Sequence, residues 1–161
     1  MALSAKSAMA SPALSRRPHV ASVTFPAARD LGPREWGCEE LVAFLPGHFT
    51  GKVLLLNAGH KGGLQYHREK HEFAYLISGE LIVRYDAGGP ARDLHEVVLH
   101  DGQLIEIPPG AVHQEEAVTD CVIFEVSTPV FNDRVRVEEQ YGLPPVGGLP
   151  TTQQEAIRYE P

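Results

Sequence analysis

Short runs of apolar residues, separated by breaks rich in Gly, Pro and charged residues, dominate the chain from about residue 20 to residue 126. Runs of this kind are typical of β-strands, and helical periodicity is scarce. The pattern predicts strands over residues 20–25, 41–44, 52–57, 63–66, 73–77, 81–85, 96–99, 103–107, 111–113 and 121–126. Because no amphipathic helix is long enough to supply a competing core, we expect an all-β, antiparallel sandwich or barrel.

One turn in this pattern has a clear local signal. The three residues Ser78-Gly79-Glu80 predict a tight hairpin between the strands on either side of them. In the strand that follows, Leu81, Val83 and Tyr85 alternate with a more polar set, so we expect these three side chains to face inward.

The two ends of the chain differ in composition from the middle. At 161 residues the chain suits a single domain, which we place at residues 30–142. Residues 1–29 are basic, rich in Ala and Ser and free of acidic residues, as expected of a flexible leader or an organellar transit peptide. Residues 143–161 are rich in Pro and Gly and predict a flexible arm. Short helices are suggested only at residues 134–141 and 153–158.

Charge and composition exclude several kinds of partner. The net charge of −7 argues against nucleic acid, which needs clustered Lys and Arg. No apolar stretch approaches the length of a membrane span. Cys38 and Cys121 lack C-x-x-C spacing, which favours buried thiols of a reducing compartment, with a single bridge as the alternative. We therefore predict a cytoplasmic protein, or an organellar one if residues 1–29 are a transit peptide.

Four residues with metal-binding side chains lie in two separate segments. Gln65 and His67 are two apart, so a strand would place both on one face, and Glu72 follows after a short polar break. His113 comes directly after a Pro-Pro-Gly turn at residues 108–110. Two imidazoles, a carboxylate and an amide oxygen suit one divalent ion, for which we prefer zinc over iron, manganese or nickel.

The same two segments resemble the two motifs of the cupin family. Glu72 and Gly79 satisfy the first, E-x6-G, while Gly102, Pro108, Gly110 and His113 satisfy the second, G-x5-P-x-G-x2-H. This resemblance implies the cupin-type antiparallel jelly roll. It also implies a small-molecule substrate and a homodimer.

One branch of that family is closer. Residues 64–67, LQYH, resemble the cupin part of type II mannose-6-phosphate isomerases, and residues 34–37 and 133–142 resemble the opening and closing motifs of that module. The likeness covers residues 34–142. Three positions depart from the family pattern: Glu69 replaces the second histidine of H-x-H, Ala117 replaces an asparagine, and Leu143 replaces the closing arginine.

The resemblance implies a metal-dependent isomerase or a related Lewis-acid enzyme. Its substrate would be a sugar, a sugar phosphate or another hydroxy-carbonyl compound. A metal with four protein ligands keeps one or two positions for water or substrate, as catalytic sites do. Glu69 and His71 are the nearest candidates for the base that moves a proton, although charged side chains at a strand break are also commonly solvated.

Two other functions fit the same residues. Without Gln65, the set of His67, Glu72 and His113 matches the two-histidine, one-carboxylate site of non-heme iron oxygenases. A cupin that binds a small molecule without turnover is the second alternative.

Cationic side chains for anchoring a substrate are numerous. The candidates are Lys52, Lys61, Arg68, Lys70 and Arg84. Arg134 and Arg136 match the closing motif, with pairing to the nearby Glu138 and Glu139 as the simpler interpretation. His60, His95 and His100 lie in loop-like or strand-edge contexts and are interpreted as surface residues.

Overall fold

The chain folds into a barrel of β-strands. The computed structural model describes residues 24, 26–89, 92–146 and 152. Within these residues the strands are β1 Arg29–Arg34, β2 Gly37–Leu45, β3 Phe49–Leu56, β4 Gln65–His67, β5 Glu72–Ser78, β6 Leu81–Asp86, β7 Leu94–Leu99, β8 Leu104–Ile107, β9 His113–Ala117, β10 Cys121–Ser127 and β11 Arg134–Arg136. A short 3-10 helix, η1, spans Glu138–Tyr141 and ends at Gly142, which adopts a left-handed conformation.

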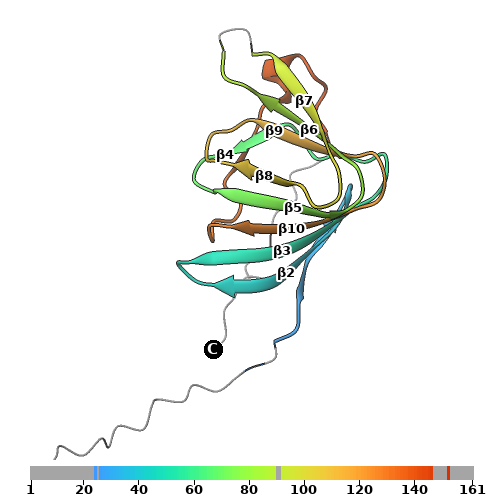
Figure 1. Ribbon diagram of the computed structural model, residues 1–161. Coiled ribbons are helices and arrows are strands. Elements are labelled where there is room, and N and C mark those ends of the chain that lie inside the picture. Colours follow the sequence, from blue (N-terminus) through green and yellow to red (C-terminus); the bar gives the residue numbers. More distant parts are fainter. Residues whose placement is uncertain (1–23, 25, 90–91, 147–151, 153–161) are drawn as a thin grey trace, which may run out of the picture.

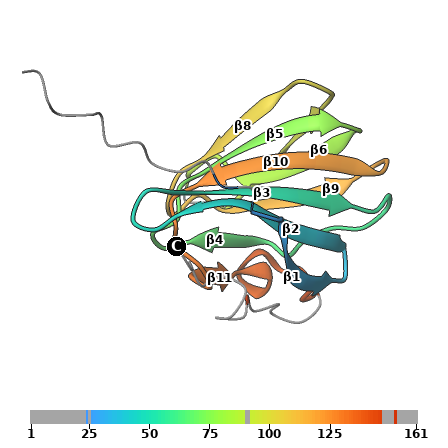
Figure 2. The same cartoon turned by 90° about the horizontal axis from the view of Figure 1, so that it is seen from below.

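The strands form two antiparallel sheets that face each other (Figure 1). One sheet has the order β1-β2-β3-β10-β5-β8, and the other has the order β11-β4-β9-β6-β7. Figure 2 shows the barrel from a second side, with β11 beside β4 on one wall. From β3 onward, every strand is followed by one in the other sheet except β6, which is followed by its neighbour β7, so the chain crosses repeatedly between sheets, as a jelly roll requires. The predicted all-β jelly roll is confirmed.

The inward faces divide the barrel into two ends. The inward side chains of β3, β10 and β5 are apolar along one half of each strand and polar along the other. The apolar end consists of Leu54, Leu56, Leu76, Cys121 and Ile123, and the charged end consists of Thr50, Lys52, Glu72, Glu125 and Ser127. The apolar end packs against Leu81, Val83 and Leu99 of the other sheet. Stability from burial is therefore concentrated at one end, and the other is available for chemistry.

The turn at Ser78-Gly79-Glu80 is not a hairpin, so that prediction was wrong. β5 and β6 belong to different sheets, and the turn carries the chain from one to the other. Gly79 has a φ of +113°, and a Cβ there would lie 2.6 Å from the Asp120 carbonyl oxygen. A hairpin and a crossover both need a tight glycine turn, so local sequence does not separate them. Leu81 and Val83 face the core as predicted, whereas Tyr85 is exposed.

Other differences from the predicted elements arise where strands are polar or lie at an edge. The edge strand β1 was missed because Gly32 and Pro33 lie within it and its register is irregular. The strand predicted at 111–113 instead begins at His113 and runs through the polar segment to Ala117. Residues 134–141 form β11 and η1 rather than one helix, because Arg134–Arg136 pairs with β4. The strand predicted at 20–25, apart from Thr24, and the helix predicted at 153–158 lie outside the described residues.

The described part of the C-terminal arm contacts the barrel at two points. The Val146 carbonyl accepts a hydrogen bond from Arg136. Thr152 is buried, and its backbone exchanges two hydrogen bonds with the side chain of Asn132, at 3.0 and 3.1 Å.

Two predictions from composition have an outcome in the structure. Both cysteines are free thiols, and Cys121 is buried as predicted, whereas Cys38 is only half-buried. Among the described residues, no helix has the length and apolar character needed to cross a membrane.

Candidate metal centre

Three of the predicted metal ligands meet at the charged end of the barrel. His67 ends β4, Glu72 begins β5 and His113 begins β9, and each residue is only 5% exposed. The Glu72 Oε2 atom lies 3.5 Å from His67 Nε2 and 3.9 Å from His113 Nε2. Bonds of about 2.0–2.2 Å to a shared ion place two ligand atoms at most about 4.4 Å apart. Both distances from Glu72 are within this limit, and all three donor atoms lie within 4.8 Å of one another, close enough for the three side chains to share one divalent ion.

Hydrogen bonds fix the tautomer of both histidines. His67 Nδ1 lies 2.6 Å from Asp133 Oδ1, and His113 Nδ1 lies 3.0 Å from the Ala111 carbonyl oxygen. A carboxylate and a carbonyl only accept, so each Nδ1 must donate its hydrogen and each Nε2 keeps a free lone pair. Burial lowers the pKa of His67, which also favours the neutral, metal-binding form.

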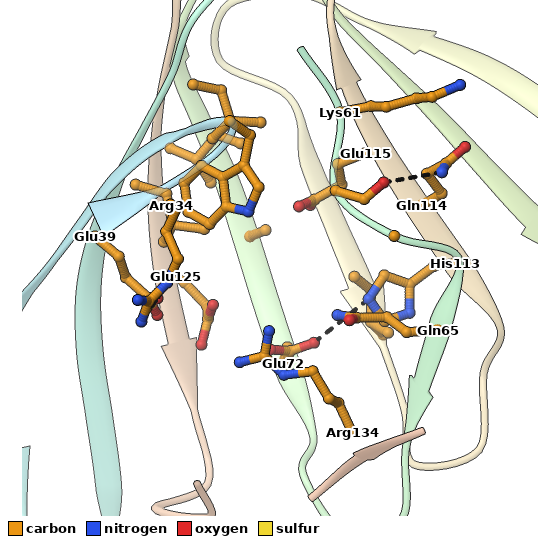
Figure 3. Close-up of a pocket in the computed structure, with 18 of the residues that line it drawn as sticks. Arg34, Glu39, Lys61, Gln65, Glu72, His113, Gln114, Glu115, Glu125 and Arg134 are labelled. Carbon is orange, nitrogen blue, oxygen red and sulfur yellow. Dashed lines mark hydrogen bonds and ion pairs between the residues drawn. The ribbon is translucent and has the colours of Figure 1, made fainter. Parts of the chain in front are cut away.

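Gln65 lies next to this cluster. It is the cross-strand partner of His113, so the two side chains share the inward face of their sheet. Figure 3 shows the Gln65 side chain beside His113 and on the side of Glu72. The structure thus brings the fourth predicted residue to the same place as the other three.

A cavity of about 310 Å³ opens on the cluster. Its apolar wall includes Trp36, Leu54 and Ile123. In Figure 3, Arg34, Glu39 and Glu125 group on one side of it, Gln65 and His113 lie on the other, and Glu72 lies between. The volume is at the small end of the range for ligand pockets.

A series of buried ion pairs leads away from Glu72 along the cavity wall. The series runs through Glu72, Lys70, Glu125, Lys52, Glu39 and Arg34, all of which are buried. The remaining pairs measure 3.0 Å (Lys70–Glu125), 2.8 Å (Lys52–Glu125), 2.8 Å (Lys52–Glu39) and 3.0 Å (Arg34–Glu39). We call these six residues the buried ion series.

The alternation of charge keeps Lys52 and Glu125, at the centre of the series, ionised. Burial alone would raise the pKa of Glu125, but the ammonium groups of Lys52 and Lys70 outweigh it and hold that pKa well below its usual range. Burial alone would lower the pKa of Lys52, yet Glu125 and Glu39 raise it. At the near end, Lys70 contacts Oε1 of Glu72, which leaves Oε2 facing the histidines.

The structure does not bring Glu69 and His71, the predicted proton-transfer residues, to the cavity. The segment between β4 and β5 folds around Asp133, whose Oδ2 accepts hydrogen bonds from the backbone N–H groups of Glu69 and Lys70 at 3.0 and 2.9 Å. The Glu69 side chain is exposed. His71 stacks on Phe73 at the surface and pairs with Glu106 at 2.9 Å.

Glu115 is one of several cavity carboxyls that were not predicted from the sequence. On β9 it lies between His113 and Ala117 on the inward face, and it lines the cavity. Burial, with the nearby charges of Glu72 and Glu125, raises the pKa of Glu115 to about 7. The signal was present in the sequence, because Glu115 is in phase with the inward residues of its strand.

The predicted anchoring cations divide into two groups. Lys52, Lys61 and Lys70 line the cavity. Arg68 is exposed, and Arg84 pairs with Glu96 and Glu116 away from the cavity. His60, His95 and His100 are exposed, as predicted.

Asp133 provides the first test of this arrangement. An Asn side chain has one oxygen that accepts and one NH₂ group that donates. In Asp133→Asn, either the NH₂ group faces the backbone N–H groups of Glu69 and Lys70, or it faces His67 Nδ1 and the hydrogen bond to that atom is lost. We expect zinc affinity to fall about 10- to 100-fold, the usual effect of removing a group that orients a metal ligand. Zinc competition against a chromophoric chelator measures it.

The matched control is Asp30→Asn, because Asp30 also accepts a backbone N–H, that of Gly32 at 2.7 Å, but at an exposed position of the edge strand β1. An Asp133→Asn protein with the zinc affinity of Asp30→Asn would show that Asp133 does not orient His67.

Comparison with known proteins identifies the fold. The cupin domain matches residues 52–127. No protein of curated function matches the sequence. The capsular polysaccharide assembling protein CapF from Staphylococcus aureus superposes with a TM-score of 0.60 at 20% identity, over 70% of this chain and 32% of CapF.

Two further solved structures share the fold. Bacillus subtilis oxalate decarboxylase, a protein with Mn(II) centres, gives a TM-score of 0.55 at 16% identity, over 70% of this chain and 31% of that one. KdgF from Halomonas sp. gives a TM-score of 0.50 at 17% identity, over 60% of this chain and 81% of the KdgF chain. The matched region thus spans about a third of CapF and of the decarboxylase. Residues 52–127 carry a cupin domain, and the chain has the cupin-type jelly-roll fold with a His-His-Glu cluster whose donors suit a divalent metal ion.

Proposed function

We propose that this protein is a metal-dependent enzyme that uses Lewis-acid chemistry on a small hydroxy-carbonyl compound. The observation that carries the proposal is the pair of fixed tautomers: His67 and His113 both direct Nε2 lone pairs toward one oxygen of Glu72. These donors face a cavity large enough for a small substrate. The resemblance of residues 34–142 to type II mannose-6-phosphate isomerases supports isomerisation of a sugar or sugar phosphate as one form of this chemistry.

The ion would be held by His67, Glu72 and His113, with Gln65 as a fourth ligand. A bound divalent ion supplies Lewis acidity, which polarises a carbonyl group and acidifies a neighbouring hydroxyl. Zinc is our first choice on the donor set. Manganese is also favoured, because a protein of the same fold is described by its Mn(II) centres.

The chain's own residues supply the remaining requirements. Trp36, Leu54 and Ile123 give the cavity an apolar wall that limits the access of water. Among the described residues, no hydrogen bond or ion pair engages the carboxyl group of Glu115, so this group is free to exchange a proton with a bound compound. Lys70 holds the other oxygen of Glu72 and keeps that side chain in place.

Solvent-isotope exchange tests the proposal without advance knowledge of the substrate. We expect protein loaded with zinc, manganese or cobalt to move solvent deuterium into a carbon next to a carbonyl, under anaerobic conditions, in at least one of a panel of small aldoses, ketoses, their phosphates and hydroxy or keto acids. Proton NMR in deuterated buffer detects the exchange. His113→Ala, which removes a proposed metal ligand, should abolish the exchange. The matched control is His95→Ala, which alters an exposed histidine stacked on Tyr85 and should leave the exchange unchanged.

The same three residues His67, Glu72 and His113 would suit a non-heme iron oxygenase if Gln65 were not a ligand. The inward position of Gln65 beside His113 favours the set of four ligands. Oxygen uptake that is tied to turnover, requires ferrous iron and disappears on zinc replacement would assign the protein to the oxygenases. Silence in both assays would assign it to non-catalytic binding proteins.

A further inference from the structure

Two arginines of β11 face the metal centre from the neighbouring edge strand. Arg134 is the cross-strand partner of His67, and Arg136 is the partner of Gln65. Directly opposed residues of an antiparallel pair point to the same face, so both arginines share the inward face with the metal donors. Both line the cavity. Figure 3 shows the Arg134 side chain reaching from β11 toward Glu72.

The guanidinium of Arg136 is already engaged. Its Nε donates to Glu138 at 3.0 Å, and it also donates to the Val146 carbonyl. It packs directly over Gly63, where a Cβ would overlap the Arg136 side chain. Arg136 is therefore a structural residue that ties β11, η1 and the C-terminal segment together.

Arg134 differs from the other cations around the cavity. Lys52, Lys70 and Arg34 are neutralised within the buried ion series, and Lys61 is exposed at the rim. Among the described residues, no hydrogen bond or ion pair engages the Arg134 guanidinium, although it is half-buried. Burial lowers its pKa, which shows that it is partly removed from water. A half-buried guanidinium without an acceptor is unfavourable, so an anionic ligand would satisfy it.

We propose that Arg134 is the specificity-determining residue of this site and that the substrate is a small carboxylic acid with a hydroxyl or carbonyl oxygen next to the carboxylate. This inference rests on the proposed function, because the neighbouring oxygen is the one offered to the metal. The planar guanidinium fork matches a carboxylate in a bidentate manner. A phosphate dianion would call for a second free cation beside Arg134. Arg136, the nearest arginine in register, is taken by Glu138 and Val146, and the exposed Lys61 points away from Arg134 in Figure 3.

Calorimetric titration with three probes tests this assignment. The probes are lactate, its uncharged analogue lactamide and inorganic phosphate, each added to zinc-loaded and to metal-free protein. We expect lactate to bind most tightly. We expect Arg134→Gln to weaken lactate binding about 10- to 100-fold, the loss caused by removing a charged hydrogen-bond partner, with zinc affinity unchanged. Arg134→Lys keeps the charge but not the planar guanidinium, so we expect its lactate affinity to lie between those of the wild type and Arg134→Gln.

The matched control is Arg84→Gln, which removes the same charge from the same sheet at Glu96 and Glu116, away from the cavity. Lactate affinity equal in Arg134→Gln and wild type, or equal for lactate and lactamide, would overturn the carboxylate assignment and leave the proposed metal function standing. Tighter binding of phosphate than of lactate, or no lactate binding to either the zinc-loaded or the metal-free protein, would overturn it as well.

A wild-type protein without zinc affinity would instead remove the proposed function. Arg134-dependent binding of lactate by the metal-free protein would, in that case, still support the recognition of a carboxylate by Arg134. If circular dichroism shows that Arg134→Gln does not fold, the lactate affinity of Arg134→Lys relative to the wild type decides the test.

Discussion

His113→Ala is expected to lose zinc affinity by more than about 100-fold, beyond the range typical of changes around a metal site. The variant removes one of the three donors that converge within 4.8 Å of one another, and a methyl group offers no replacement. The remaining donors keep their positions because Asp133 holds His67 and Lys70 holds Glu72, so the loss falls on the metal and not on the fold. Elemental analysis of protein purified without added metal, followed by chelator competition, measures it.

His95→Ala is the control, and it should retain the wild-type zinc content. If His113→Ala and His95→Ala hold equal amounts of zinc, the ion lies elsewhere and the cupin assignment survives only for the fold.

Lys52→Met is expected to lower the free energy of unfolding by about 3–5 kcal/mol at neutral pH. The ammonium of Lys52 lies 2.8 Å from both Glu39 and Glu125, and its loss leaves two carboxylates buried without their shared partner. Urea denaturation at pH 7 measures the difference. Lys61→Met, at the exposed rim of the same cavity, should stay within about 0.5 kcal/mol of wild type.

The sign of the pH dependence gives a second readout for Lys52→Met. In the wild-type protein the folded pKa of Glu125 is below its ordinary value of 4.5, so the folded state binds fewer protons than the unfolded state between these two values. This stabilisation is present above pH 4.5 and is lost as the pH falls toward the lowered pKa. In Lys52→Met the carboxylates are protonated more easily, so the deficit relative to wild type should shrink below pH 4.5. A deficit that is under 1 kcal/mol at pH 7 and constant with pH would show that the ion series does not stabilise the fold.

The sequence predicts the strands that have apolar inward faces and misses those that do not. β3, β5 and β10 follow apolar alternation, whereas β9 carries only Ala117 as an apolar inward residue and β11 is three residues of an edge. Hydropathy assigns charged positions to the surface. The inward positions of Lys52 and Glu125 appear only when their phase within apolar strands is considered.

The candidate site was predictable where a motif covers it. His67, Glu72 and His113 were found from their spacing and type, and Gln65 lies with them. Asp133 was not assigned a role, because its contact with His67 joins positions 66 residues apart. Glu69 and His71 were chosen for nearness in sequence to Glu72, but the segment wraps around Asp133 and turns their side chains outward.

The order of strands in the two sheets also determines when the site can form during folding. β3 pairs with β10 in a register that joins Thr50 to Ser127, 77 positions apart, and His67 meets Asp133 only after β11 has joined β4. Contacts of such long range form late, since the chain loses loop entropy before it gains them. A nascent chain that lacks residues beyond 127 would carry all four metal-binding side chains but not Asp133, so it would bind the ion more weakly, and the site would reach its full affinity only when β11 joins β4.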